Sequence, residues 1–339
     1  MKKSIVPFMF ITFCFIFMSC NPAKDGKITI QGEALGTFYT IHAYHNDTTL
    51  AFRNNLQEGI DSLLAEFNAI ASVYDFNSEI SKVNQNNDIE VSDLFIDVFQ
   101  KSIEMNELSM GAFDITVGAL VNAWGFGFTD SLHVSNEVID SLLQLTGMKK
   151  IRIEGRKVIK DDPRILLDMN GIAKGYAVDI VADYIESLGI SSYIVEIGGE
   201  IRAGNLKPNE EKWIIAIEKP SKDSLSPQQE EQRIGLNNCA IATSGTYRKY
   251  YERNGERYSH TIDPSTGYPV HHSMLSATII ASDCMTADAL ATGSMALGIE
   301  KAMQMCESTD GIEGYFILGN SDGTWTIRCT KGFKKYFME

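Results

Sequence analysis

The stretch Asp168-Met-Asn-Gly-Ile-Ala-Lys-Gly-Tyr176 decides how the middle of this chain folds. The apolar run Ile165–Leu167 before it predicts a strand, and Asn170-Gly171 predicts a turn. Apolar residues then recur at helical spacing as far as Leu188, which predicts an amphipathic helix. Free backbone amides at that helix start, together with Lys174, suit a phosphate group. An ordinary capped helix start explains the same residues.

Strand and helix patterns alternate irregularly in the rest of the chain. Helical periodicity is clear in Leu56–Ile70 and Phe95–Phe99. The absence of a regular strand–helix–strand rhythm favours the α+β class over a doubly wound parallel sheet. Further strands are expected at Ile28–Ile41, Lys149–Ile153, Tyr193–Ile197, Trp213–Glu218, Leu275–Ala281, Tyr315–Leu318 and Thr324–Arg328.

The first residues read as an export signal. Lys2 and Lys3 precede an apolar run from Ile5 to Met18, which is shorter than the about 20 apolar residues that a membrane span needs. Ser19-Cys20 resembles the cleavage site of bacterial lipoproteins, so we expect a signal peptide over 1–19, a lipidated Cys20 and a tether over 20–27. Ordinary secretion with Cys20 as a passenger is the alternative.

The formal net charge of −14 argues against nucleic acid as a partner, because such binding depends on clustered Lys and Arg. A phosphate ligand on so acidic a protein needs local help from helix amides, a lysine or a bound cation. Cys239, Cys284, Cys306 and Cys329 show no metal-binding spacing, and the sequence leaves open whether they form disulfides or are buried thiols.

Asp288 and Thr292 are candidate ligands of a hard cation. They are four residues apart in the Ala-rich segment Thr286–Leu297, and helical spacing would place both on one face. Mg²⁺ takes one or two protein carboxylates and completes its shell with water and substrate phosphate, so this sparse set suits it. Alternatively, Asp288 caps or decorates the first turn of its helix, while the Thr292 hydroxyl bonds back to the same helix.

His260, in Tyr258-Ser-His-Thr-Ile-Asp-Pro-Ser-Thr-Gly267, is a candidate proton acceptor. An imidazole can take a proton from a hydroxyl nucleophile or bond a phosphate oxygen. A turn histidine bonded to a backbone carbonyl is the structural alternative. Ser244 lacks the flanking G-x-S-x-G pattern, which excludes a serine hydrolase of that type. The glycine- and aromatic-rich stretch 111–127 could wall a planar ring or form a glycine-broken core strand.

These segments together resemble the ApbE family, flavin transferases that move FMN from FAD onto a protein. The resemblance covers the chain from about Ile28 to its end and implies one large α+β domain over 28–339, with mixed, mainly antiparallel sheets and packed helices. It rests on Ala34–Thr37, Tyr74–Ser81, Gly111–Gly127, Asp168–Asp179, Val195–Glu200, Ala242–Gly245, Tyr258–Val270 and Ala287–Thr292.

The resemblance also implies roles for individual residues. Asp288, Thr292 and the backbone carbonyl of Ala173 would hold Mg²⁺. Lys174 would lie near the phosphates of FAD, and His260 would be the base, with Asp168 as the fallback. The flavin nucleotide would be lined by Leu35, where the family often has methionine, and by Tyr74, Ala112, Phe113, Asp114, Asn170 and Tyr176.

The activity implied is transfer of FMN to a serine or threonine hydroxyl of an acceptor flavoprotein, with release of AMP. The expected acceptor is a subunit of an exported respiratory or redox complex, and the expected location is the membrane surface facing the periplasm. Two other readings keep the same residues. One is a Mg²⁺-dependent FAD pyrophosphatase that gives FMN and AMP, and the other is a lipoprotein that binds flavin without catalysis.

Overall fold

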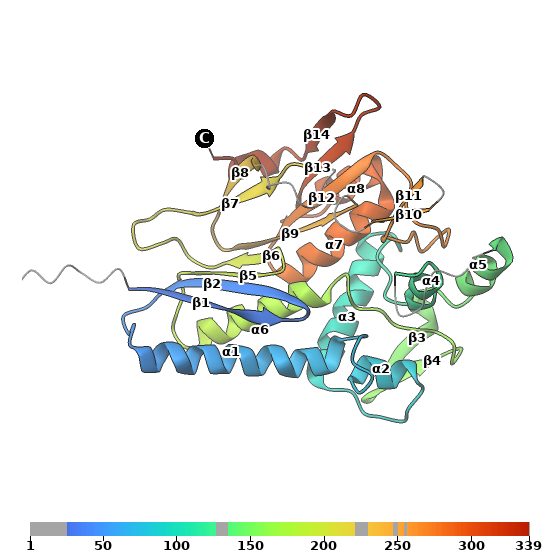
Figure 1. Ribbon diagram of the computed structural model, residues 1–339, viewed down its shortest axis with the longest axis horizontal. Helices are drawn as coiled ribbons and strands as arrows, with labels where there is room; N and C mark the ends of the chain where they lie inside the picture. The colour runs from blue at the N-terminus through green and yellow to red at the C-terminus, as the bar shows by residue number, and fades with distance from the viewer. Residues whose placement is uncertain (1–25, 127–134, 221–229, 247–249, 254–255, 339) are drawn as a thin grey trace, which may run out of the picture.

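The computed structural model describes residues 26–126, 135–220, 230–246, 250–253 and 256–338 (Figure 1). The expected signal peptide, Cys20 and the tether as far as residue 25 lie outside the described residues. In the part of the chain that is described, no helix is both long and apolar enough to cross a membrane.

The core of the fold is an eight-stranded sheet in the order β1-β2-β5-β6-β9-β12-β13-β14. Every neighbouring pair in it is antiparallel, which confirms the predicted α+β class with mainly antiparallel pairing. Its strands are β1 (Lys27–Ala34), β2 (Thr37–Tyr44), β5 (Tyr193–Ile197), β6 (Glu200–Ala203), β9 (Cys239–Gly245), β12 (Met274–Ala281), β13 (Glu313–Gly319) and β14 (Trp325–Cys329).

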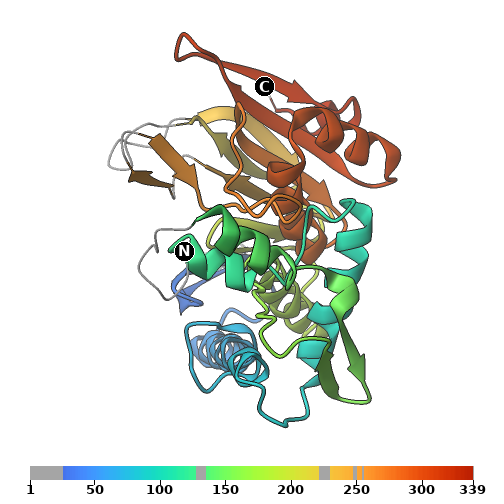
Figure 2. The same cartoon turned by 90° about the vertical axis from the view of Figure 1, so that its right-hand side faces the viewer.

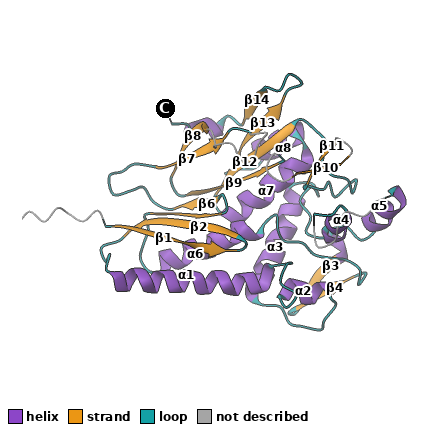
Figure 3. Ribbon diagram, viewed as in Figure 1, coloured by secondary structure: helices purple, strands orange, loops and turns teal. Residues whose placement is uncertain are grey.

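Helices α1 (Leu50–Ala71), α6 (Ala173–Ser187) and α7 (Cys284–Leu297) pack on one face of this sheet (Figures 1 and 3). Because side chains alternate along a strand, Ala242 joins the core on the helical side while Ile241 joins a second core on the opposite face. The second core is covered by the hairpin of β7 (Trp213–Glu218) and β8 (Glu230–Leu236).

Helix α7 is apolar around most of its circumference. Ala287, Ala289, Leu290 and Ala291 are all fully buried, as expected for a helix enclosed by protein on every side. Its small side chains let neighbouring backbones approach closely. A buried polar residue on this helix therefore has to face a specific partner.

A smaller set of elements lies at one end of the molecule, on the right in Figure 1 and toward the viewer in Figure 2. It includes α4 (Gly118–Ala123) and α5 (Asn136–Leu143), which contact each other. Helix α8 (Ile299–Ser308) does not belong to this set and packs against α7 and β13. The remaining elements are α2 (Glu79–Asn84), α3 (Asp93–Leu108), β3 (Ile151–Glu154), β4 (Lys157–Lys160), β10 (Tyr250–Arg253), β11 (Glu256–Ser259) and the short 3₁₀ helices Met148–Lys150 and Gly332–Tyr336.

Two local expectations need correction. The run Ile28–Ile41 is a hairpin of two strands, turning at Leu35 and Gly36 with φ of 53° and 71°. Ile165–Leu167 forms only an isolated bridge from Leu166 to Val117. The reason is that the Asn84 side chain takes both backbone groups of Leu167, donating to its carbonyl at 2.9 Å and accepting from its amide at 2.7 Å.

Candidate active site

The start of α6 is held directly against α7. The backbone amide of Gly175 donates to Oδ2 of Asp288 at 2.9 Å. A Cβ at Gly175 would overlap the carbonyl oxygen of Cys284, so only glycine permits this approach of the two helices. The amides of Ile172 and Ala173 both donate to the Met169 carbonyl. Most of the amides expected to be free for a phosphate are therefore already bonded.

Asp288 and Thr292 share one face of α7, as their spacing predicts, and in the structure this face meets the segment 171–175. A Cβ at Gly171 would lie 3.1 Å from Cγ2 of Thr292, and the Thr292 hydroxyl bonds the Ser244 hydroxyl at 3.1 Å. Asp288 does not cap its own helix, because Asp283 does so, accepting from the Thr286 amide at 2.8 Å. The local structural alternative for Asp288 is therefore wrong, and Asp288 contacts a neighbouring helix.

Lys174 is partly exposed and forms an ion pair with the buried Glu200 that the sequence analysis did not predict. Its Nζ lies 2.6 Å from Oε1 of Glu200 and 3.9 Å from Oδ1 of Asp288. The Glu200 side chain is 5% exposed, and burial raises its pKa to about 7, with Lys174 opposing the rise. Burial alone would lower the pKa of Lys174, but Asp288 and Glu200 outweigh it and raise that pKa above its usual value.

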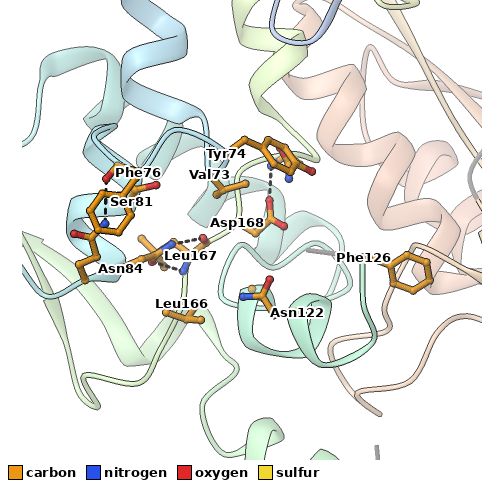
Figure 4. Close-up of a pocket in the computed structure, with 13 residues that line it drawn as sticks. Val73, Tyr74, Phe76, Ser81, Asn84, Asn122, Phe126, Leu166, Leu167 and Asp168 are labelled. Atoms are coloured by element: carbon orange, nitrogen blue, oxygen red, sulfur yellow. Dashed lines mark hydrogen bonds between the residues drawn. The ribbon is translucent and has the colours of Figure 1, made fainter. Parts of the chain in front are cut away.

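A cavity of about 360 Å³ (Figure 4) is lined in part by Asp168 and Asn170, which come shortly before Lys174 in the chain. Tyr74, Asp168 and Asn170, all predicted site residues, line it. Tyr74 is 66% exposed, which leaves its ring accessible to a ligand. The other lining residues are Val73, Phe76, Ser81, Asn84, Gln85, Gly118, Asn122, Phe126, Leu166 and Leu167. Sequence reasoning missed the polar pair Asn84 and Asn122, which carry no motif of their own.

Asp168 lines the cavity and begins the segment 168–175, which continues to Lys174 of the ion-pair cluster. Its carboxylate accepts from the Asn170 amide at 2.8 Å. Burial raises the pKa of Asp168 above its ordinary value, and the Asn170 amide opposes that rise. The pKa of the Tyr74 hydroxyl is also raised. Burial of Tyr74 is the larger cause, and the negative charge of Asp168 is the second.

His260 lies against the Phe126 wall of the cavity. The two rings meet edge to face with centroids 6.5 Å apart. The loop after His260 is held by Trp124, two residues before Phe126, because Nε1 of Trp124 donates to the Gly267 carbonyl at 2.8 Å. Stretch 111–126 thus forms turns and helix α4 rather than a core strand, and Gly118, Asn122 and Phe126 line the cavity.

Five other predicted nucleotide contacts are not among the residues that line this cavity. Asp114 accepts from the Thr116 amide at 2.8 Å, and the Tyr176 hydroxyl donates to Asp97 at 2.7 Å. Burial raises the pKa of Asp114. Phe113 is buried, Ala112 is partly exposed, and Leu35 lies at the tip of the β1–β2 hairpin. That tip is close to the cluster, because a Cβ at Gly198 would lie 2.9 Å from Thr37 and 3.5 Å from Lys174.

The donors near Lys174 suit a hard divalent cation. Asp288 Oδ1, the Thr292 hydroxyl and a backbone carbonyl at Ala173 are all oxygen groups of the kind that Mg²⁺ prefers. One oxygen of the buried Glu200 carboxylate has no hydrogen-bond partner, and the cluster sets two carboxylates, of Glu200 and Asp288, against the single ammonium of Lys174. Among the described residues, no cluster of three or more His, Cys, Asp or Glu side chains is arranged to hold a metal ion. A cation here would therefore need oxygens from its substrate or from water.

The sequence matches the model of the ApbE family over residues 35–316. The chain belongs to the ApbE family. A curated relative from Vibrio cholerae, named FAD:protein FMN transferase, is 43% identical over 89% of this chain and 90% of its own length. The relative of the same name from Haemophilus influenzae is 37% identical over 99% of this chain and 98% of its own.

Solved structures of ApbE proteins share the fold. The flavin transferase ApbE from Vibrio cholerae superimposes with a TM-score of 0.81 at 40% identity, covering 91% of this chain and 99% of its own. The apo flavinyl transferase ApbE from Pseudomonas stutzeri gives 0.81 at 32% identity, covering 92% and 96%. This ApbE chain is therefore a single α+β domain and an enzyme of the transferase class.

Proposed function

We propose that this ApbE chain is a Mg²⁺-dependent FAD:protein FMN transferase that moves FMN from FAD to a serine or threonine hydroxyl of an acceptor flavoprotein and releases AMP. One observation supports this most directly. The single segment 168–175 borders the cavity with Asp168 and Asn170 and borders the cation-type cluster with Gly171 and Gly175. A nucleotide that spans the two features would present its diphosphate beside Lys174.

The cavity is suited to one end of the dinucleotide. Its volume of about 360 Å³ is at the lower end of the range for ligand pockets, about 300–1,000 Å³. The exposed Tyr74 ring can cover a planar group, while Asn122 and Asn170 offer hydrogen bonds to its polar edge. The remaining predicted contacts, from Leu35 to Tyr176, stay predictions about the rest of the nucleotide.

Asp288, Thr292 and the Ala173 carbonyl would hold Mg²⁺, and Lys174 would pair with a phosphate oxygen. When bound, the ion neutralises the negative charge that grows on the diphosphate oxygens during transfer. Lys174 can contribute to the same neutralisation because Asp288 and Glu200 keep its ammonium charged. Gly171 and Gly175 fix the distance between these groups by holding α6 against α7.

The reaction needs one proton acceptor and no covalent enzyme intermediate. The hydroxyl oxygen of the acceptor protein forms a bond to the phosphorus on the FMN side of FAD. The bond from that phosphorus to the oxygen that bridges the two phosphates breaks. AMP leaves with the bridging oxygen, and His260 takes the proton of the incoming hydroxyl. Asp168 is the fallback base, since burial raises its pKa and makes it a better proton acceptor than an exposed aspartate.

Incubation of the protein with FAD and Mg²⁺, with and without an acceptor protein, tests the proposal. Covalent flavin fluorescence on the acceptor after denaturing gel electrophoresis supports transfer. Release of AMP and FMN at the same rate without acceptor would instead identify a pyrophosphatase, and intact FAD would identify a protein that only binds flavin.

We also propose that the chain is exported and anchored at a periplasm-facing membrane surface through lipid on Cys20, so that its acceptor is an exported flavoprotein. Support comes from the N-terminal sequence, where Ser19-Cys20 follows the apolar run. Replacement of Cys20 by Ser should move the mature protein from the membrane fraction to the soluble fraction. Persistence of a C20S protein in the membrane after its signal has been removed, as judged by its mass, would contradict lipid anchoring at this residue.

A further inference from the structure

Glu200 has a carboxylate oxygen that the fold leaves without a hydrogen-bond partner. Its side chain is 5% exposed, and Oε2 has no hydrogen-bond partner although it is buried. Burial of an unsatisfied carboxylate oxygen costs stability. A neutral or fully bonded side chain would suit packing better at this position, which points to a role for the charge itself.

The other carboxylate of the cluster has one oxygen in use and one available. Oδ2 of Asp288 accepts from the Gly175 amide at 2.9 Å, which leaves Oδ1 facing Lys174. Nζ of Lys174 lies 3.9 Å from this Oδ1, too far for a hydrogen bond, and 2.6 Å from Oε1 of Glu200. The ammonium is therefore bonded to Glu200 and only near Asp288.

The backbone keeps Glu200 in place. It begins β6 directly after Gly198 and Gly199, whose φ values of 63° and 104° make the turn from β5. Ile197 and Glu200 pair across that hairpin. Lys174, by contrast, is a long flexible side chain that could move its ammonium toward Asp288 if nothing held it.

We propose that Glu200 is a positioning residue that holds the Lys174 ammonium away from Asp288 and so keeps Oδ1 of Asp288 available to a divalent cation. This inference rests on the proposed function, which places the cation at Asp288. Without the Glu200 carboxylate, Lys174 would pair with Asp288 and compete with the cation for that oxygen. Residues that orient a metal ligand without touching the metal typically change its affinity by about 10–100-fold.

The test is a double-mutant cycle read by Mn²⁺ binding to the protein without FAD, measured from the electron paramagnetic resonance signal of free Mn²⁺. E200Q should weaken Mn²⁺ binding by about tenfold or more. In the K174M background, the same E200Q change should have little effect, because the competing ammonium is absent. K174M alone should bind Mn²⁺ at least as tightly as the unchanged protein. E196Q, which removes an exposed carboxylate from the same hairpin, is the matched control.

Three outcomes overturn the proposal. An equal loss from E200Q in both backgrounds would mean that Glu200 acts as a ligand or as a general charge. Unchanged Mn²⁺ binding in E200Q would exclude competition by Lys174. Weaker Mn²⁺ binding in K174M would exclude it as well, and that measurement does not require the E200Q variant to fold. In each of these cases Mn²⁺ binding by the unchanged protein keeps the proposed function intact. If the unchanged protein binds Mn²⁺ only when FAD is present, the same cycle is read with FAD. Failure to bind Mn²⁺ in both conditions would remove the cation, and this inference with it.

Discussion

Asp179 on α6 and Asp288 on α7 each bond backbone amides near the start of the other helix. Asp179 accepts from the amides of Cys284 at 2.9 Å and Met285 at 2.8 Å, while Asp288 accepts from the Gly175 amide at 2.9 Å. Arg202 lies 3.2 Å from Asp179 and balances its charge. The two helix starts that form the candidate site are thus fixed to each other by a reciprocal pair of carboxylates, and the site geometry depends on both.

The contact at Gly175 predicts a large effect of a single methyl group. Gly175→Ala would drive a Cβ into the Cys284 carbonyl and part the two helices, lowering the free energy of unfolding by about 1–3 kcal/mol. Chemical denaturation measures this. Gly171→Ala is the control, because its Cβ would lie 3.1 Å from a side-chain methyl that can move. Equal stability of the two variants would show that the helices are not in close contact.

The buried Asp179 predicts a pH dependence of stability. Burial raises its pKa to about 6 in the folded protein, although both amides and Arg202 oppose the rise. The unfolded value is about 3.9, so the folded state binds more protons between these two pH values. The contribution of Asp179 to stability is therefore full below about pH 4 and is lost as pH rises to about 6. Urea denaturation of Asp179→Asn should show a smaller decline over this interval than the unchanged protein shows. An identical pH profile would contradict the assignment.

Asp288→Ala should abolish flavin transfer, because it removes the carboxylate proposed to hold the cation. The measurement is covalent flavin fluorescence on an acceptor after gel electrophoresis, and a chelator added to the unchanged protein should reproduce the loss. Since Asp288 also bonds Gly175, Asp288→Asn serves as the control that keeps an acceptor oxygen for that amide. Full activity of both variants would remove the cation from the proposed function.

His260→Ala should reduce turnover more than it reduces FAD affinity. A general base typically contributes about 10²–10⁴-fold to the rate. Single-turnover transfer and FAD titration, measured side by side, separate the two quantities. If FAD affinity collapses while the turnover of bound FAD stays normal, His260 is a nucleotide contact and Asp168 becomes the base to test by Asp168→Asn.

The spacing of apolar residues along the chain predicted individual helices well, but it predicted the pairing of distant segments poorly. The helix expected as far as Leu188 is α6, which ends at Ser187. The strand expected at Ile165–Leu167 is absent, because the side chain of Asn84 bonds the backbone of Leu167 in place of a neighbouring strand. Asn84 and Leu167 are far apart in the chain, and no spacing rule links them. The replacement of strand pairing by side-chain hydrogen bonds could therefore not be predicted from the sequence.

The candidate site divides in the same way. The sequence by itself determined that Asp288 and Thr292 share a helix face, because one turn of an α-helix fixes that relation. Only the tertiary structure decided that this face meets Gly171 and Gly175, and that Glu200 holds Lys174. Such contacts depend on the order of strands in the sheet and on the close approach that glycines allow between α6 and α7, and neither is written in the spacing of residues along the chain.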